Sequence, residues 1–411
     1  MKSEIQLRGS IDLGTTKISA MVAEVRGTHL RIIGVGTAPS EGLKQGMIVD
    51  IEQTAAVLNR VVGEAEQMAG LSAARVYNVG VGGEHIRSMN SRGVVAIPDL
   101  NTEIDEEDVG RALRAAQKFS LPYDREIIHT LAQEFIVDAQ RGIRQPTGMY
   151  GSRLEARVHV VTASRPALDN VAKALRLAGV EMGEMVVEPL ASGYAVLDDD
   201  EREMGVMLLD IGGGTTDVAL FVDGGVAASG VIGLGGNNIT NDLAYGLRTS
   251  QHDAEAIKIQ HGCAMTSMVN AGETVDVPVI GFRGNRRVTK HLLAGIIEPR
   301  VEELFSLINQ QISENGLKKA IGAGVVLTGG SAMLGGIREL AEQVFGLPAR
   351  VGSPREVDGL SEVVNHPKFA TGVGLLCLDG QLDARRPQGV TGTKRLRHSF
   401  NQLKRAIASF I

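Results

Sequence analysis

The sequence contains few cysteines and no hydrophobic run that could cross a membrane. Its 411 residues include two cysteines, Cys263 and Cys377. Two thiols exclude a disulfide framework and a four-cysteine metal site, and we expect both to be buried thiols in a reducing compartment. A membrane-spanning helix needs about 20 consecutive apolar residues, and no segment approaches that length. The amino-terminal stretch contains an acidic residue, Glu4, and lacks the long apolar run of a signal peptide, so we expect no signal peptide.

Several common catalytic motifs are also absent. The phosphate-binding pattern G-x-x-x-x-G-K-[ST] and the strict dinucleotide pattern G-x-G-x-x-G do not occur. Neither does the G-x-S-x-G elbow of α/β-hydrolases or the H-E-x-x-H pair of zinc proteases. The nine histidines are not clustered at metal-ligand spacing, and we interpret His261 beside Cys263 as structural. These absences exclude the usual sequence signatures of P-loop, Rossmann, hydrolase and zinc enzymes.

Charge is distributed unevenly along the chain. The net charge is −6, and residues from 381 onward include seven Lys or Arg and one acid, Asp383. The end of the chain therefore carries +6 and residues 1–380 carry −12. An acidic body repels nucleic acid, so the basic end needs a local explanation.

Two glycine-rich segments resemble each other. They are GSIDLGTTKISAMVAEV (9–25) and GVMLLDIGGGTTDVALFVDG (205–224). Each consists of an apolar strand, an aspartate, a glycine turn, Thr-Thr and a second apolar strand, which predicts a β-hairpin. The aspartates, Asp12 and Asp210, lie 198 residues apart. Similar segments at this spacing indicate two similar lobes rather than an array of short repeats.

Predicted strands and helices alternate through the rest of the chain. Hydrophobic periodicity predicts helices over 103–120, 249–262 and 290–316, strand–helix pairs within 159–197 and 322–346, and a closing helix over 367–378. This alternation predicts an α/β fold in which buried sheets form two lobes. The segment 380–393 contains glycine, proline and polar residues, and we expect a flexible linker there.

The two hairpins together predict a phosphate-binding site. Glycine lets the backbone approach an anion closely, and successive N–H groups form an anion-binding concavity. Asp12 and Asp210 would repel phosphate, so we expect a divalent cation, most simply Mg²⁺, beside them. A third glycine turn, at Gly329 and Gly330, follows a strand and precedes a helix, which suits a purine base and its nearest phosphate. Each turn alone is also explained as a tight strand connection, whereas three in this order favour a nucleotide.

These motifs resemble those of the actin, heat-shock chaperone and sugar kinase superfamily over about residues 8–378. IDLGTTKIS and LLDIGGGTTDVAL are similar to its two phosphate motifs, VVLTGGSAMLGG to its adenosine motif, and VVEPLASGYAVL and FATGVGLLCL to its connecting helices. Within the superfamily the chain resembles the bacterial FtsA cell-division proteins, through DAEAIKIQHGCAM, IIEPR and an amphipathic end. The resemblance implies an actin-like ATP-binding protein that polymerises, binds the tubulin-like FtsZ and tethers its filaments to the inner membrane face at the division septum.

The resemblance also implies a division into parts. An inserted αβ subdomain, which replaces an actin subdomain, is expected at 85–163, and contacts with itself or with later division proteins are expected there. The first lobe would comprise 1–84, 164–200 and the closing segment 351–379. The second lobe would span 201–350, with an outer subdomain at about 235–300. The linker 380–393 and an amphipathic helix at 394–411 would follow.

Site residues carry over one by one from the resemblance. Asp12 and Asp210 would face Mg²⁺. Glu188, with Asp210, is the catalytic candidate and would orient the attacking water, although a carboxylate before Pro189 also simply favours a helix N-terminus. The residues implied to contact the phosphates of ATP are Gly14, Thr15, Thr16, Lys17, Gly212, Gly213, Gly214 and Thr215. Those implied to line the cleft or hold the ribose and base are Gly235, Gly236, Asn237, Glu255, Lys258, Gly329, Gly330 and Met333.

The family pattern places FtsZ binding on the outer part of the second lobe. Arg300 and Glu303 are the candidate contact residues, because IEPR matches the family. They are equally explained as an i,i+3 ion pair on a solvated helix face.

Three other functions fit parts of the pattern. A sugar or acid kinase would need a base for its acceptor hydroxyl, and Asp217 follows Thr-Thr in the second hairpin, but the sequence shows no acceptor pocket. A chaperone would carry a β-rich substrate domain after residue 378, where only a linker and one helix are expected. An actin-like pilus-assembly protein would normally have no basic amphipathic end. Weak ATP hydrolysis is compatible with the favoured function, and no metabolic activity is expected.

The end of the chain, KRLRHSFNQLKRAIASFI (394–411), has the pattern of an interfacial membrane helix. At about 100° per residue, its large apolar side chains fall within one arc of about 100°. These are Leu396, Phe400, Leu403, Ile407, Phe410 and Ile411. Basic side chains, including Lys404 and Arg405, lie at the border of this arc or beyond it. The alternatives are docking on the protein's own core or in a partner's groove, but the surplus positive charge favours an anionic lipid surface.

Overall fold

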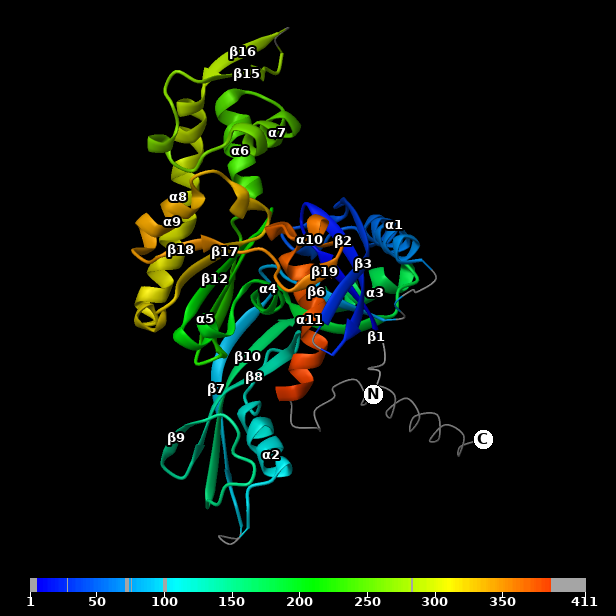
Figure 1. Ribbon diagram of the computed structural model, residues 1–411, viewed down its shortest axis with the longest axis vertical. Helices are drawn as coiled ribbons and strands as arrows, with labels where there is room; N and C mark the ends of the chain where they lie inside the picture. The colour runs from blue at the N-terminus through cyan, green and yellow to red at the C-terminus, as the bar shows by residue number, and fades with distance from the viewer. Residues whose placement is uncertain are drawn as a thin grey trace. The chain divides into compact units, whose positions relative to one another are not determined.

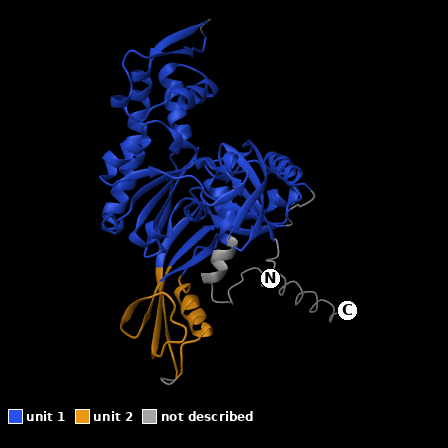
Figure 2. Ribbon diagram, in the orientation of Figure 1, with its two compact units in different colours: residues 1–90, 120–133, 159–378 blue, residues 91–119, 134–158, 379–411 orange. Residues whose placement is uncertain are grey.

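The computed structural model divides the chain into two compact units (Figure 2). The larger unit comprises residues 1–90, 120–133 and 159–378, and the smaller comprises 91–119, 134–158 and 379–411. The structure describes residues 6–27, 29–70, 74, 76–98, 102–281 and 284–385. Of residues 379–385 it describes only the backbone. The larger unit contains two α/β lobes, each built on its own sheet (Figure 1).

The first lobe is built on a six-stranded sheet in the order β11-β6-β1-β2-β3-β19. Its strands are β1 (Gln6–Leu13), β2 (Lys17–Arg26), β3 (His29–Pro39), β6 (Tyr77–Val81), β11 (Met182–Val187) and β19 (Val357–Gly359). Strands β1, β2 and β3 form an antiparallel meander, β6 pairs in parallel with β1, and β11 pairs in parallel with β6. Helices α1 (Ile51–Ala69) and α3 (Arg165–Leu177) pack on this sheet through buried side chains such as Leu58 and Leu175.

The sheet of the second lobe repeats this arrangement in the order β14-β13-β12-β17-β18. Its strands are β12 (Val206–Ile211), β13 (Thr216–Val222), β14 (Gly225–Ile232), β17 (Gly324–Thr328) and β18 (Ala349–Val351). Again a three-stranded meander is extended by two parallel strands. The two hairpins predicted from the sequence, β1–β2 and β12–β13, are confirmed. They occupy equivalent positions in the two sheets, which explains why their sequences resemble each other.

Two helices cover the second sheet, α8 (Lys290–Glu314) and α9 (Ile337–Phe345). The rings of Phe305 and Phe345 meet in this core with centroids 5.3 Å apart, and both side chains are fully buried. The buried positions of α8 recur every three or four residues, as expected for a helix that buries one face. Beyond the sheet lie α6 (Gly236–Leu247), α7 (Gln251–His261) and the hairpin β15 (Thr274–Pro278) and β16 (Asn285–Thr289) (Figure 1).

Helices α4 (Glu188–Val196) and α11 (Ala370–Arg385) connect the two lobes. Helix α4 contacts β6 and β11 of the first sheet and β12 and β13 of the second. The two helices cross closely, because a Cβ on Gly374 would lie 1.8 Å from the carbonyl oxygen of Ala191. Only glycine permits that approach. At the crossing, the sequences Ala-Ser-Gly (191–193) and Ala-Thr-Gly (370–372) repeat each other.

The predicted helices are confirmed, with one difference at the end of the chain. The closing helix was expected over 367–378, whereas α11 continues to Arg385 after the short helix η4 (Pro367–Phe369). Residues 380–385, the start of the predicted linker, are therefore helical. The rest of that linker and the predicted membrane helix at 394–411 lie outside the described residues. Among the helices that the structure describes, none is long and apolar enough to span a membrane. Both cysteines are free thiols and only half-buried.

The predicted inserted module is a small αβ structure, as expected. Its four-stranded sheet has the order β7-β10-β8-β9, with β7 (Arg87–Ala96), β8 (Arg125–Val137), β9 (Gln140–Ile143) and β10 (Arg153–Ser164). Helix α2 (Glu106–Ala116) packs so closely on β7 that a Cβ on Gly93 would lie 2.1 Å from the carbonyl oxygen of Ala112. A capping box between Asp105 and Asp108 starts this helix.

The parts of β7, β8 and β10 that belong to the larger unit are hydrogen-bonded to β14, an edge strand of the second sheet. His159 of β10 lies with Nδ1 2.7 Å from Asn90 Oδ1 and Nε2 2.8 Å from Ser229 Oγ. Gln133 donates to the carbonyls of Val226 and Ala227, each at 3.0 Å. Side chains thus satisfy backbone groups that an exposed edge strand would leave free. His159 is 2% exposed, and burial lowers its pKa to about 4.

The low pKa of His159 predicts a loss of stability in mild acid. The pKa falls from 6.5 in the unfolded reference to about 4 in the fold, so between these values the unfolded chain binds the proton more tightly. The free energy of unfolding should fall by up to about 3 kcal/mol as the pH is lowered through this window, and should not depend on this group above it. Urea unfolding of the wild type and His159→Gln, at pH 7 and about pH 4.5, measures the contribution. The glutamine keeps hydrogen-bonding groups but cannot take up the proton, so an identical pH dependence of the two proteins would contradict this role of His159.

Candidate functional site

A cavity of about 390 Å³ lies between the two lobes of the larger unit. It is lined by most of the residues that the sequence singled out. These are Asp12, Gly14, Thr15, Thr16, Lys17, Glu188, Asp210, Gly212, Gly213, Thr215, Asn237, Glu255, Lys258, Gly329, Gly330 and Met333. Three others, Gly214, Gly235 and Gly236, are not part of the lining but contact residues that are. The structure therefore brings together three glycine turns that are far apart in the sequence.

The turns of the two phosphate-type hairpins face each other at close range. A Cβ on Gly213 would lie 2.2 Å from Cγ2 of Thr16, and a Cβ on Gly214 would lie 2.7 Å from Oγ1 of Thr15. Side chains at these glycines would force the turns apart. The glycines are thus needed for the approach of the lobes as well as for a backbone surface that an anion can reach.

The second lobe completes the cavity with the start of α6 and one face of α7. The N–H groups of Gly236 and Asn237 donate to the carbonyls of Gly212 and Gly213, at 2.9 and 2.8 Å. Lys258 Nζ lies 2.7 Å from Glu255 Oε2 and 3.0 Å from the carbonyl oxygen of Gly236. The predicted placement of Glu255 and Lys258 on one face of a helix is confirmed.

Three carboxylates line the cavity, those of Asp12, Glu188 and Asp210, and a fourth, Asp217, is buried outside the lining. Asp12 and Asp210 are each 7% exposed and Asp217 is 3% exposed, while Glu188 is partly buried at the first residue of α4. In the strand pairs, Asp12 lies opposite Ser19, whereas Asp210 lies opposite Asp217. The second hairpin therefore carries an additional acid.

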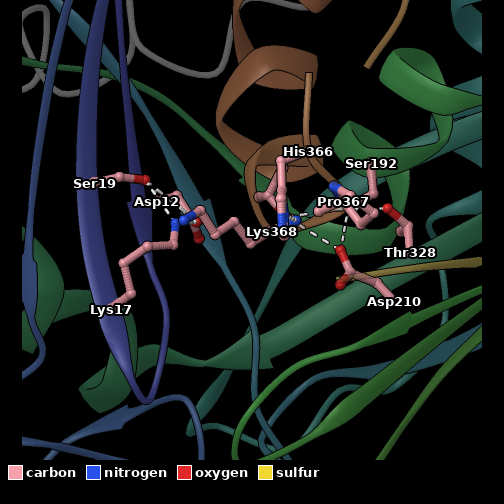
Figure 3. A network of polar contacts seen from close by, with 10 residues as sticks. Asp12, Lys17, Ser19, Ser192, Asp210, Thr328, His366, Pro367 and Lys368 are labelled. Atoms are coloured by element: carbon pink, nitrogen blue, oxygen red, sulfur yellow. Dashed lines mark hydrogen bonds and ion pairs between the residues drawn. The ribbon is translucent and has the colours of Figure 1, made fainter. Parts of the chain in front are cut away.

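Hydrogen bonds hold two of these carboxylates in place (Figure 3). Lys17 Nζ donates to Asp12 Oδ2 at 2.9 Å. Asp210 Oδ2 accepts hydrogen bonds from the hydroxyls of Ser192 and, at 3.2 Å, of Thr371. The two hydroxyl oxygens are themselves 3.0 Å apart. Asp12 is thus fixed within its own hairpin, and Asp210 is fixed by the two helices that connect the lobes.

Burial and mutual repulsion disfavour the negative charge at three of the acids. Burial raises the pKa of Asp210 to about 6, although the hydrogen bond from Ser192 opposes the rise. Burial and the neighbouring Asp217 raise the pKa of Glu188 well above its usual range, and burial and Asp210 do the same for Asp217. Positive charge entering the cavity would stabilise the ionised forms.

The carboxylates suit a hydrated cation better than a fully protein-ligated one. Among the described residues, no group of three or more His, Cys, Asp or Glu side chains is arranged to hold a metal ion. Of the oxygens of these four carboxylates, the buried Oδ1 of Asp217 has no hydrogen-bond partner within the described part of the chain. Mg²⁺ typically keeps several waters and takes one or two carboxylates together with substrate phosphates. The residues present fit that mode of binding.

Some lining residues were not anticipated from the sequence. His366, Pro367, Lys368 and Thr371 line the cavity from the segment that leads into α11. The repeat of Ala-Ser-Gly in Ala-Thr-Gly was a usable signal for Thr371, since it places two hydroxyls at equivalent positions of the connecting helices. No spacing or motif indicated His366 or Lys368.

The predicted partner-binding residues lie on α8. Arg300 donates through Nε to Asp242 Oδ2 at 2.6 Å and also pairs with Glu303. The predicted i,i+3 pair therefore exists, and a bond to α6 extends it. The predicted membrane-binding residues, Leu396 to Ile411, lie outside the described residues.

Gly329 provides a stability test of the third turn. Its φ of 85° is in the left-handed region, and a Cβ would lie 2.4 Å from Asp210 Oδ1. Gly316 is a matched control, because its φ is 69° and nothing lies within 4 Å of a Cβ there. Gly316→Ala should cost about 1 kcal/mol of backbone strain, and Gly329→Ala should cost at least about 2 kcal/mol more because Asp210 or the turn must move. Urea unfolding measures both, and equal losses would show that the turn and Asp210 are not closely packed.

Two family profiles match the chain. One, described as cell division protein FtsA, matches residues 207–374. The other, described as an SHS2 domain inserted in FtsA, matches residues 83–162, which is the region that forms the inserted αβ module.

Two solved structures show the same fold at low sequence identity. A PilM–PilN type IV pilus biogenesis complex matches with a TM-score of 0.66 and 19% identity, over 91% of this chain and 98% of that one. MreB5 of Spiroplasma citri bound to ADP matches with a TM-score of 0.58 and 15% identity, over 93% of this chain and 99% of that one. These likenesses confirm the predicted actin-like α/β fold and, at such identities, nothing further.

The chain is much more similar in sequence to a known cell-division protein than to those two structures. The cell division protein FtsA of Pseudomonas aeruginosa is 46% identical over 367 residues, which are 89% of this chain and 87% of that protein. Similarity of this extent, in both the actin-like core and its insertion, shows that the chain belongs to the FtsA family of cell-division proteins.

Proposed function

We propose that this cell-division protein binds ATP with Mg²⁺ in the cavity between its lobes, and that its ATP-bound copies assemble into filaments that link FtsZ to the membrane. The observation that supports ATP binding most strongly is the convergence of three glycine turns on one cavity of about 390 Å³. This volume is within the usual range for small-molecule sites. The structural neighbour MreB5 was solved with ADP bound, which is consistent with nucleotide binding by this fold.

The phosphates would lie between the facing hairpin turns. Backbone N–H groups of glycine turns are suited to phosphate oxygens, and Lys17 supplies a positive charge on the first-lobe side. The base would lie near Gly330 and Met333, opposite the Glu255–Lys258 pair. Met333 is 54% exposed, as a side chain at the open end of the cavity would be.

Asp12 and Asp210 would hold Mg²⁺ through its waters. The ion, when bound, would neutralise phosphate charge. Glu188, at the start of α4, is the candidate for orienting a water, and its raised pKa means that its negative charge is costly until positive charge is near. The rival kinase activity has less support, since the cavity lining does not include Asp217, the candidate base.

Membrane attachment is proposed for the amphipathic segment 394–411. Six large apolar side chains contribute roughly 1.5–3 kcal/mol each if fully buried, but partial insertion and the ordering of the helix remove much of this. A single copy should therefore bind reversibly. A filament that presents many copies gains avidity, so assembly with ATP would convert weak attachment into firm attachment.

Flotation with anionic lipid vesicles tests this coupling. The wild type should float more completely with ATP and Mg²⁺ than without them, and Phe400→Glu should lose most of the flotation because a charge enters the apolar arc. Asn401→Glu is the matched control, because it adds the same charge about 100° away on the helix and should float nearly as well as the wild type. Flotation that is insensitive to both Phe400→Glu and ATP would sink the proposal.

We place FtsZ binding on the outer part of the second lobe, with Arg300 and Glu303 as contact residues. Because Arg300 also pairs with Asp242, a charge reversal has two effects that must be separated. Arg300→Glu alone places three acids together, at 242, 300 and 303, whereas Arg300→Glu with Asp242→Arg restores an ion pair. A contact role predicts that both proteins bind an FtsZ tail peptide about tenfold or more weakly, since a charged contact is worth about 1.5–3 kcal/mol. Recovery of affinity in the double variant would assign Arg300 a structural role instead.

A further inference from the structure

Lys368 stands in a short segment that is fixed against the third glycine turn. The carbonyl oxygen of Pro367 accepts hydrogen bonds from the Gly329 N–H at 3.3 Å and from Thr328 Oγ1 at 3.4 Å. A Cβ on Gly330 would lie 4.0 Å from the Cβ of Lys368. The backbone of this segment is therefore held beside the turn at which we place the base and its nearest phosphate.

The cavity contains three lysines, and they differ in their partners. Lys17 pairs with Asp12 at 2.9 Å, and Lys258 pairs with Glu255 at 2.7 Å. Lys368 also lines the cavity, but over the described part of the chain it makes no ion pair with a carboxylate. Its positive charge is thus available to an incoming anion.

An aromatic ring supports Lys368 without neutralising it. Its Nζ lies 5.0 Å from the ring centroid of Phe369, and Lys17 Nζ lies at the same distance of 5.0 Å from that ring. The two ammonium groups are therefore no more than about twice this distance apart. Cation–π contacts orient a charged side chain and leave its donors free. Phe369 itself is buried, at 3% exposed, so the support is rigid.

His366 adds a neutral donor next to these cations. Its Nδ1 accepts the backbone N–H of Lys368 at 3.2 Å, so the proton of the neutral ring resides on Nε2. Burial, followed by the charges of Lys368 and Lys17, lowers the pKa of His366, and the ring stays neutral near pH 7. In the view of Figure 3, His366 and Lys368 lie between the Asp12–Lys17 pair and Asp210.

We propose that Lys368, assisted by the Nε2–H of His366, binds a phosphate group of the nucleotide and makes the affinity of the site depend on the number of phosphates. The inference rests on the proposed nucleotide binding and names its ligand class as nucleoside di- and triphosphates rather than monophosphates. Lys17 projects from the first hairpin and Lys368 from beside the third turn. The Cβ of Lys368 lies beside Gly330, whereas its ammonium group shares the ring of Phe369 with that of Lys17. A chain of phosphates therefore reaches both cations, whereas a single phosphate next to the base lies nearer to the backbone of Lys368 than to its charge.

The test compares the affinities of ATP, ADP and AMP, each with Mg²⁺, by titration calorimetry on the full chain. Lys368→Met keeps the length of the side chain and its packing on Phe369 but removes the charge. It should weaken ATP and ADP binding about tenfold or more, as expected for loss of a charge-assisted hydrogen bond, and AMP binding less than about threefold. His366→Ala should show the same order of effects with smaller losses. Lys368→Arg should keep affinities within about threefold of the wild type.

Lys319→Met is the matched control for net charge, because Lys319 is an exposed residue outside the cavity. It should leave all three affinities unchanged. Equal weakening of ATP, ADP and AMP by Lys368→Met, or no weakening of any of them, overturns the inference while leaving nucleotide binding intact. A loss in Lys368→Arg as large as that in Lys368→Met also overturns it, since the charge would then be irrelevant. A wild-type protein that binds none of the three nucleotides refutes the proposed function itself.

Discussion

The central constraint in this molecule is the burial of Asp210, a carboxylate that accepts hydrogen bonds from two helices at once. Ser192 of α4 and Thr371 of α11 both donate to the same oxygen, and their hydroxyls lie 3.0 Å apart. Burial raises the pKa of Asp210 to about 6, and these hydrogen bonds offset part of the cost of an ionised group at that depth. Because α4 and α11 connect the lobes, this side chain of the second glycine hairpin also holds the two helices together.

The same two helices bring the functional groups of both lobes to one cavity. Helix α4 begins at Glu188, and the segment before α11 carries His366 and Lys368. The two halves repeat each other in topology but not in charge, since Thr-Thr is followed by Lys17 in the first hairpin and by Asp217 in the second. The first hairpin therefore contributes one acid and one lysine, whereas the second contributes two acids. A ligand that contains both phosphates and a cation matches this division.

The sequence predicted features that depend on patterns within a short segment. It missed features that depend on contacts between segments far apart in the chain. Both hairpins and the third turn were found because glycine, aspartate and threonine recur within each short segment. Residues such as Lys368 were not found, because nothing near them in the chain indicates the cavity. The partner of Arg300 was missed for the same reason, since Asp242 lies on another helix. The end of α11 was placed too early because the glycine, proline and polar residues of 380–393 were interpreted as a linker. One glycine costs a helix only about 1 kcal/mol, and Gln381, Leu382 and Ala384 favour helix.

The charge division also explains how ligand binding would act on assembly under the proposed function. Without ligand, the buried acids of the second lobe repel one another, while the hairpin turns approach each other closely at Gly213 and Gly214. A bound phosphate chain with its cation would attract Lys17 of the first hairpin and the acids of the second, which would stabilise one arrangement of the lobes over others. Copies in a filament must repeat the same interface, so a ligand that selects one arrangement lowers the cost of each addition. Attachment through the segment 394–411 would then depend on filament length, and through it on the occupancy of a cavity that other parts of the chain form.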